Sequence, residues 1–308
     1  MDPITLLVIS NPGGSHLRLL HQLQEPVNIM VGDDPAFLKS NAAEAEVILN
    51  GGPDGELLRT IFPLAPRLRW VHAVSAGVER VLFPELIESP VPLTNGRGVF
   101  KDALAEFAMA AILFFAKGLR RLVHSQEAGR WDQFDIEFVR GQTLGIVGYG
   151  EIGRESARLA EALGMKVVAV RRQTVQRLRE ILSVSDFVLV ATPLTAETRG
   201  MIGEAELAAM KRSAVIINVG RGPVIVESAL IAALSEKRIR GAALDVFDEE
   251  PLPGGHPFYH LDNVLLSPHS TDHTVAWPEL AMQAFVDNFE RFRNGQPLQN
   301  VVDKKAGY

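Results

Sequence analysis

The 308-residue chain alternates short apolar runs with segments of helical periodicity along most of its length. Runs that are apolar on both faces and separated by helix-length segments are typical of parallel strands in a sheet covered on both sides. The pattern predicts one series of strands at 6–10, 27–30, 47–50 and 70–74. It predicts a second series at 144–148, 166–170, 186–191, 214–219, 241–246 and 263–268. Two such series predict two α/β domains, which a chain of this length can supply.

Two helical segments lie outside the alternation. Residues 98–131 are rich in Ala, Leu and Phe and predict one long helix or a broken pair, with Gly118 and Gly129 as break points. Residues 277–295 predict an amphipathic helix, and their pattern leaves open which domain that helix covers.

Composition and charge exclude several classes of function. A net charge of −6 argues against nucleic acid and anionic membrane as partners. The most apolar helical stretch, 107–116, is half the roughly 20 residues that a bilayer span needs, and the N-terminus lacks the basic region of a signal peptide. The chain has no cysteine, which rules out disulfides and thiolate metal sites and fits a reducing cytoplasm. Its histidines lack ligand spacing, so no metal site is predicted.

A glycine loop opens the second series. Gly148, Gly150 and Gly153 form G-x-G-x-x-G, with Tyr149, Glu151 and Ile152 between them, directly after a strand and at the start of a helix. In that context the first glycine permits a tight turn, the second lets the backbone approach a pyrophosphate, and the third lets helix and strand pack closely. We predict a dinucleotide site; a purely structural turn is the alternative.

The end of the next strand indicates which dinucleotide binds. Arg171 lies 18 residues after Gly153, where an NAD site keeps an acid for the ribose hydroxyls. A guanidinium can instead bind a 2′-phosphate through charge-assisted hydrogen bonds, and Arg172 offers further donors. The pair therefore favours NADP(H), with NAD(H) as the alternative cofactor. The other interpretation is that both arginines only solvate a strand end.

The later strands end in ionisable residues. Arg221, Asp245 and His269 follow or terminate three of them, and Glu250 lies 19 residues before the histidine. Ligands of open α/β sheets bind at the carboxyl ends of the strands. An arginine for a carboxylate and a histidine poised by an acid suit the reduction of a 2-oxo acid. Taken singly, each of these residues also has an ordinary structural explanation.

Six motifs follow one another in a recognisable order: VSAGVE (74–79), GYGEIG (148–153), ATPLTAETRGMI (191–202), NVGRG (218–222), ALDVFDEEPLP (243–253) and SPHS (267–270). With them the chain resembles the D-isomer-specific 2-hydroxyacid dehydrogenase family over nearly its whole length. The resemblance implies Arg221 as the substrate-binding arginine, His269 as the general acid/base and Glu250, just before Pro251, as its partner. It further implies the backbone N–H groups of Ala76 and Gly77 as ligands of the substrate carboxylate. The remaining cofactor-binding residues that it implies are Thr192, Pro193, Val219, Gly220 and Asp245.

The resemblance also implies an architecture of two doubly wound parallel-sheet domains. A Rossmann cofactor domain (98–274) would be inserted into a discontinuous flavodoxin-like substrate domain (1–97 plus 275–308). Members of the family are usually homodimers joined through the segment that corresponds to 100–122. A helix buried within one subunit is the alternative for that segment.

Three places depart from the family pattern. Only 14 residues separate Arg172 from Phe187, where the family usually has a longer loop and helix. STDHT follows His269, so Asp272 and His273 stand where small apolar residues and glycine are expected. Lys101 and His72 lie near the expected cleft, and we expect a solvated helix-start lysine and a core or rim histidine.

We therefore predict an NADPH-preferring enzyme that reduces a small 2-oxo acid, with glyoxylate and hydroxypyruvate as first candidates, to the D-2-hydroxy acid. One alternative is a dinucleotide-sensing, corepressor-like binding protein of the same fold. Another is an oxidoreductase acting on phosphite or formate, although the formate type has Gln in place of the acid partner, so Glu250 argues against it.

Overall fold

The computed structural model describes residues 3–24, 26–52 and 55–308. It divides into unit 1, Met1–Phe100 with Val275–Tyr308, and unit 2, Lys101–Thr274. The first crossover thus falls after residue 100, where the sequence predicted 97. Phe100 stays with unit 1 because its ring packs 6.2 Å from that of Trp277, and helix α4 begins at the next residue.

The sheet of unit 1 is parallel throughout and has the order β2-β1-β3-β4-β5, the order of flavodoxin. Its strands are β1 (Ile4–Ile9), β2 (Val27–Gly32), β3 (Val47–Asn50), β4 (Trp70–Ala73) and β5 (Leu93–Asn95). The strand β5 was not predicted, because its three residues are too few to form an apolar pattern. The C-terminal segment covers its outer edge, since Val302 N–H donates to the Leu93 carbonyl at 2.8 Å.

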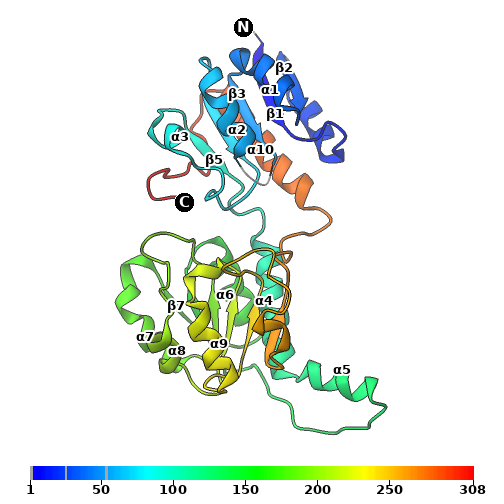
Figure 1. Ribbon diagram of the computed structural model, residues 1–308, viewed down its shortest axis with the longest axis vertical. Helices are drawn as coiled ribbons and strands as arrows, with labels where there is room; N and C mark the ends of the chain where they lie inside the picture. The colour runs from blue at the N-terminus through cyan, green and yellow to red at the C-terminus, as the bar shows by residue number, and fades with distance from the viewer. Residues whose placement is uncertain (1–2, 25, 53–54) are drawn as a thin grey trace. The chain divides into compact units, whose positions relative to one another are not determined.

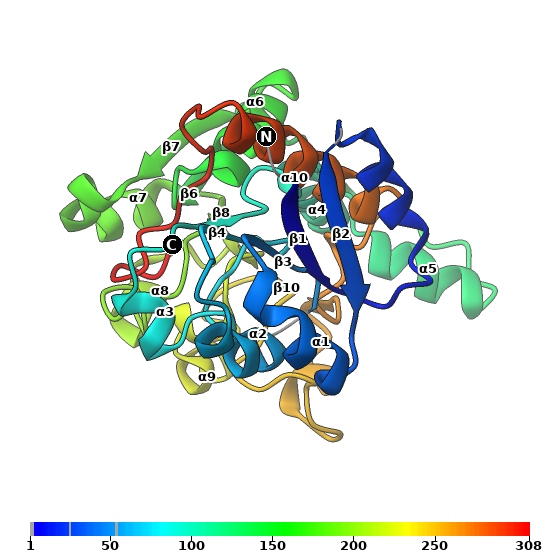
Figure 2. The ribbon, with the colours of Figure 1, turned by 90° about the horizontal axis from the view of Figure 1, so that it is seen from above.

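Helices cover both faces of this sheet (Figure 2). Alternate residues of β1 point to opposite faces: Leu7 packs with α1, α2 and α3, whereas Leu6 packs with α10. The α10 side is the more aromatic, since the Trp70 and Phe285 rings stack 5.4 Å apart. The helical elements are η1 (Ser15–Gln22), α1 (Pro35–Asn41), η2 (Ala42–Glu44), α2 (Glu56–Ile61), η3 (Phe62–Leu64), α3 (Pro84–Glu88) and α10 (Trp277–Arg293). The C-terminal helix α10 therefore covers the sheet of unit 1. Its periodicity in the sequence had left open which of the two domains it would cover.

Unit 2 holds a second all-parallel sheet, of order β11-β10-β9-β8-β6-β7. Its strands are β6 (Thr143–Val147), β7 (Lys166–Val170), β8 (Phe187–Val190), β9 (Val215–Asn218), β10 (Gly241–Leu244) and β11 (Val264–Leu266). The chain passes from β6 to β7 on one side and returns to β8 on the other, so the topological switch point lies between β6 and β8. The prediction of two parallel α/β sheets is confirmed.

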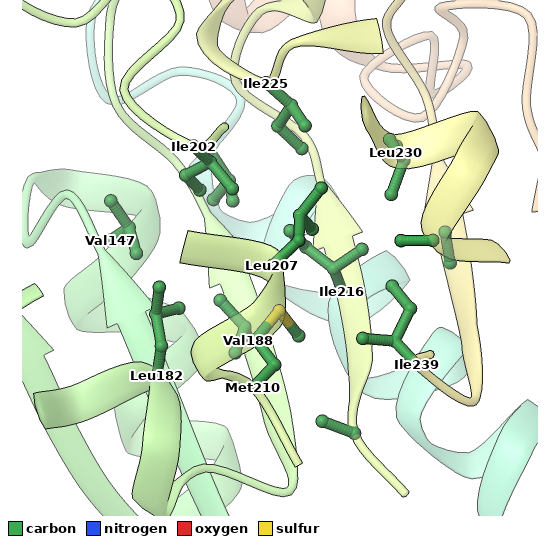
Figure 3. Close-up of a cluster of buried hydrophobic side chains, with 14 of the residues drawn as sticks. Val147, Leu182, Val188, Ile202, Leu207, Met210, Ile216, Ile225, Leu230 and Ile239 are labelled. Atoms are coloured by element: carbon green, nitrogen blue, oxygen red, sulfur yellow. The ribbon is translucent and has the colours of Figure 1, made fainter. Parts of the chain in front are cut away.

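The usual dinucleotide-binding fold has a further strand beyond the one that corresponds to β7. Here the connection from β7 to β8 contains only η4 (Arg172–Arg177) and α7 (Leu178–Val184), so β7 is the edge strand among the described residues. One face of the sheet packs against α7, α8 and α9, as Figure 3 shows for Val188, Leu207 and Leu230. The remaining helical elements of unit 2 are α4 (Lys101–Ala116), α5 (Leu119–Glu127), α6 (Glu151–Ala162), α8 (Glu204–Ala209), η5 (Gly222–Val224), α9 (Glu227–Ser235) and η6 (Pro257–His260).

The segment 98–131 contains two helices, so of the two predicted alternatives the broken pair is the one that forms. Gly118 has φ +61°, a left-handed conformation that separates α4 from α5. Most apolar residues of α4 are buried within unit 2, whereas α5 and the loop after it extend away from the rest of that unit (Figure 1). Among the described residues, no helix combines the length and apolarity that crossing a bilayer requires.

Candidate active site

The glycine loop follows β6 and leads into α6. Gly148 has φ +99°, and a Cβ there would lie 2.6 Å from the Ala191 carbonyl oxygen at the end of β8. A Cβ on Gly153 would lie 2.3 Å from the Gly148 carbonyl oxygen, whereas a Cβ on Gly150 would meet nothing within 4 Å. Gly148 and Gly153 are therefore required by close packing inside the protein. Gly150 leaves open space beside the N-terminus of α6.

The loop after β8 lies across the switch point from the glycine loop. Thr192 is buried, and Pro193, next to it, is exposed. A Cβ on Gly220, in the loop after β9, would lie 2.8 Å from the Thr192 carbonyl oxygen. Three loops thus meet at the carboxyl edge of the sheet, where open α/β sheets bind their ligands.

The two arginines after β7 lie in different environments. The Arg171 guanidinium lies 4.8 Å from the centre of the Tyr149 ring, so a cation–π contact holds it against the glycine loop. Arg172 forms an ion pair with Glu197 at 2.8 Å, and both side chains are exposed. Arg171 thus packs on the loop that is expected to bind the pyrophosphate.

The loop after β9 carries Arg221. The buried Asn218 side chain accepts from Gly220 N–H at 3.1 Å and donates to the Arg221 carbonyl at 3.1 Å, which fixes the backbone on both sides of the turn. The half-buried Arg221 guanidinium donates to the Gly220 carbonyl at 2.7 Å. Asn218, which sequence reasoning did not single out, is therefore a support for the arginine.

His269 and Glu250 form a close pair at the same edge. His269 Nδ1 lies 2.7 Å from Glu250 Oε2, and Glu250 Oε1 accepts from Phe247 N–H at 3.0 Å. Of the three consecutive acids at 248–250, Glu250 is the partner of the histidine. Hydrogen bonding to Glu250 raises the pKa of His269, with burial and the Arg221 charge opposing the shift. The imidazole therefore holds its proton to a higher pH than a free histidine does.

The backbone around His269 is held by Asp245. His269 has φ +50°, a left-handed conformation that is uncommon for a residue with a side chain. The buried Asp245 carboxylate accepts from Ser270 N–H at 3.0 Å, from Thr271 N–H at 3.3 Å and from Thr271 Oγ1 at 2.6 Å. The resemblance implied Asp245 as a cofactor-binding residue, which stays a prediction, and its carboxylate also bonds the loop after His269. Sequence reasoning missed Thr271, although the unusual STDHT run contains it.

Unit 1 presents the loop that carries Ala76 and Gly77. Ser75 Oγ donates to the Gly77 carbonyl at 2.8 Å, and Asn95 Nδ2 donates to the Ala76 carbonyl at 2.6 Å. In the part of the chain that the structure describes, the N–H groups of Ala76 and Gly77 have no hydrogen-bond acceptor. Two adjacent N–H groups without an acceptor can donate hydrogen bonds to an anion.

The other residues singled out in the sequence have local roles. His72 is buried, with Nδ1 2.7 Å from Thr94 Oγ1, and burial lowers its pKa to about 3. Lys101 pairs with Asp102 at 2.8 Å at the start of α4. Asp272 and His273 lie 3.6 Å apart, next to the loop that Asp245 holds. No group of three or more possible metal ligands occurs within the described ranges.

The residues at this edge fit a nicotinamide dinucleotide. The open space at Gly150 and the N-terminus of the 12-residue helix α6 suit a pyrophosphate, because the helix dipole and free N–H groups attract anions there. Arg171 lies at the end of β7, the position from which a side chain contacts the adenosine ribose of a bound dinucleotide. The loop of Val219 and Gly220 follows β9 and lines the opposite side of the switch point.

Comparison with known proteins agrees with this arrangement. A family model described as D-isomer specific 2-hydroxyacid dehydrogenase, NAD binding domain, matches residues 109–271, more than half of the chain. A glyoxylate reductase of Thermococcus gammatolerans is 36% identical over 273 residues, which make up 82% of this chain and 80% of that protein.

Solved structures extend the likeness to the whole fold. An NADPH-dependent glyoxylate/hydroxypyruvate reductase from Sinorhizobium meliloti, in complex with NADP and sulfate, is 27% identical. It has a TM-score of 0.86 and covers 99% of this chain and 100% of its own. A D-isomer specific 2-hydroxyacid dehydrogenase from Xanthobacter autotrophicus, in complex with NADPH and MES, is 29% identical with a TM-score of 0.83 and the same coverage. The chain therefore belongs to the D-isomer-specific 2-hydroxyacid dehydrogenases, NAD(P)-dependent oxidoreductases of 2-hydroxy acids.

Proposed function

We propose that this enzyme reduces a small 2-oxo acid, glyoxylate or hydroxypyruvate in the first instance, to the D-2-hydroxy acid and prefers NADPH. We also propose unit 2 as the cofactor domain and unit 1 as the substrate domain. The observation that carries the proposal is the 2.7 Å pair of His269 Nδ1 and Glu250 Oε2 at the same edge as Arg221 and the glycine loop.

The pair gives His269 its role. With Nδ1–H donated to Glu250, a protonated imidazole keeps the Nε2 proton free for transfer, and the carboxylate stabilises the charged form. The bound cofactor supplies the hydride that C2 of the substrate takes up. His269 gives its Nε2 proton to the carbonyl oxygen, so that a C–H and an O–H bond form as the C=O double bond is lost.

Two groups would hold the substrate. The Arg221 guanidinium binds the carboxylate and polarises the carbonyl, with its backbone fixed by Asn218. The free N–H groups of Ala76 and Gly77 bind the carboxylate from the substrate domain. Both interactions favour 2-oxo acids over simple aldehydes and ketones.

The preference for NADPH rests on Arg171. Its guanidinium is exposed, carries no carboxylate partner among the described residues and is held on Tyr149. The relatives in complex with NADP and NADPH support the same choice.

The test is a panel of 2-oxo acids assayed with NADPH and with NADH. Turnover of glyoxylate or hydroxypyruvate is expected. Tight cofactor binding without turnover of any acid would instead support a dinucleotide-sensing protein. His269→Ala should lower kcat/KM by roughly 10²- to 10⁴-fold and leave the Kd for NADPH nearly unchanged. His260→Ala, which removes an exposed imidazole from the same unit, is the matched control. Retained activity in His269→Ala would remove the histidine from its role.

We further propose a cytoplasmic homodimer, joined through α5 and the loop after it. The segment 100–122 was the expected interface, but its α4 part is buried within unit 2. Figure 1 shows α5 and the loop after it extending from the rest of unit 2, and the exposed apolar residues of this region follow Gly118; Trp131 and Phe138 are 92% and 81% exposed. Exposed apolar surface of this kind marks an association site. Trp131→Ser with Phe138→Ser should convert a dimer to a monomer in sedimentation; a monomeric wild type would contradict the proposal.

A further inference from the structure

A cavity lies at the carboxyl edge of the sheet of unit 1. Its walls come from the ends of β1, β3 and β4 and from the first turns of α10, and its volume is about 40 Å³. Because the strand order is 2-1-3-4-5, the topological switch point of this sheet lies between β1 and β3, and the cavity occupies that position. Ligands of open α/β sheets bind at such points. The lining residues are Val8, Ser10, His16, Leu49, Gly51, Val74, Trp277, Pro278, Ala281 and Met282.

The cavity adjoins the loop assigned to the substrate carboxylate. Val74 forms part of its wall, and the free N–H groups of Ala76 and Gly77 follow within three residues. In a 2-oxo acid, the third carbon is separated from the carboxylate only by the carbonyl carbon. In a substrate held at Ala76 and Gly77, a third carbon that points toward Val74 enters this cavity.

The chemistry of the walls selects the substituent. Most of the lining is apolar, and Ser10 and His16 supply the polar side chains. Neither the Ser10 hydroxyl nor the His16 imidazole has a hydrogen-bond partner within residues 3–24, 26–52 and 55–308. No Lys or Arg occurs among the described lining residues. The cavity thus offers hydrogen bonds to a hydroxyl and no side chain of fixed positive charge for an anionic group.

The neighbouring histidine adds no charge. His72 pairs with Leu49 across the ladder and lies two residues before Val74 on the same strand face, so it borders the cavity wall. Burial lowers its pKa to about 3, which keeps the imidazole neutral at physiological pH. Size acts in the same direction, since the cavity volume of about 40 Å³ is small. The small volume and the lack of Lys or Arg among the described lining residues both favour a hydroxymethyl group over a phosphorylated one.

We propose that this cavity receives the substituent on the third carbon of the 2-oxo acid and selects a small, uncharged, hydroxyl-bearing group. Ser10 and Ala281 then determine specificity, Ser10 by hydrogen bonding and Ala281 by the space that it leaves. The inference rests on the proposed reduction of 2-oxo acids and names hydroxypyruvate as the class of substrate that the site fits best.

The experiment compares kcat/KM for glyoxylate, pyruvate, hydroxypyruvate and 3-phosphohydroxypyruvate. In the wild type, hydroxypyruvate should exceed its phosphorylated form by more than roughly tenfold. Ser10→Ala should lower the ratio of hydroxypyruvate to pyruvate by roughly fivefold, since only hydroxypyruvate has the hydroxyl. Ala281→Leu fills the cavity and should lower the ratio of hydroxypyruvate to glyoxylate at least tenfold, because glyoxylate has no third carbon. Ala284→Leu adds the same side chain to α10 away from the cavity and should leave both ratios unchanged.

The outcomes separate the two proposals. A wild type that reduces none of the four acids defeats the proposed function. A wild type that reduces them, with both ratios unchanged in Ser10→Ala and Ala281→Leu, overturns the cavity assignment alone. Efficient reduction of the phosphorylated acid overturns it as well. If thermal unfolding shows that Ala281→Leu is not folded, the Ser10→Ala ratio decides, because that change removes one hydroxyl and adds no volume.

Discussion

Replacing Arg171 by Ala tests the origin of the cofactor preference most directly. The exposed Arg171 guanidinium lies 4.8 Å from the Tyr149 ring, and the neighbouring arginine is already paired with Glu197. A charge-assisted hydrogen bond contributes about 1.5–3 kcal/mol, and solvent screening at this exposed position favours the lower end. About 1.5 kcal/mol corresponds to a roughly tenfold loss of NADPH affinity. NADH has no 2′-phosphate, so its affinity should change less than about twofold.

The assay is a fluorescence titration of each cofactor. The readout is the Kd for NADH divided by the Kd for NADPH, a ratio that rises with the preference for NADPH. Arg177→Ala is the matched control, because Arg177 lies on the same segment and pairs with Glu180 instead of packing on the glycine loop. Tyr149→Ala should lower the ratio by roughly two- to fivefold, since a cation–π contact at an exposed site contributes about 0.5–1 kcal/mol. The preference should also weaken at high salt. Equal losses of NADPH and NADH affinity in Arg171→Ala would refute the reasoning.

Three further predictions test the active site and the core. Glu250→Gln removes the charge that raises the pKa of His269. The pH above which reductase activity falls should therefore be lower in this variant than in the wild type. An unchanged pH–rate profile would argue against the pairing. Gly150→Ala should fold normally but bind cofactor at least tenfold more weakly, because its methyl group enters the open space beside α6. Gly153→Ala should instead lower the melting temperature, since its methyl group meets the Gly148 carbonyl. Phe285→Ala deletes a fully buried ring stacked on Trp70 and should lower the free energy of unfolding, measured in urea, by about 3–5 kcal/mol. The control Gln283→Ala should lower it by less than about 0.5 kcal/mol. A loss below 1 kcal/mol in Phe285→Ala would contradict the packing described for α10.

Much of the fold could be predicted because burial leaves a local pattern. Strands that helices cover on both faces are continuous apolar runs, and all of the predicted runs are strands of the two sheets. The strand β5 was missed because its three residues are too few to carry a pattern. The break between α4 and α5 was predicted at Gly118, but which part would be buried was not, because both parts contain apolar residues.

The site shows the same division between local and distant information. The glycine loop is a local motif, and its three glycines have separate packing reasons that its spacing already indicated. The partners of Asp245 could not be predicted, because they lie 25 and 26 residues away on another loop. Family resemblance supplied the pairing of His269 with Glu250, whose geometry the fold then provides.

The sequence by itself determined the number of domains, their parallel sheets and the position of the dinucleotide loop, because each of these follows from a pattern of residues close together along the chain. Only the tertiary structure decided that Ser10, Leu49, Val74 and Ala281 surround one cavity. These residues come from four segments far apart along the chain, and the strand order together with the packing of α10 on the sheet brings them together. Periodicity reports which face of an element is buried, whereas the shape of a cavity depends on which elements meet there.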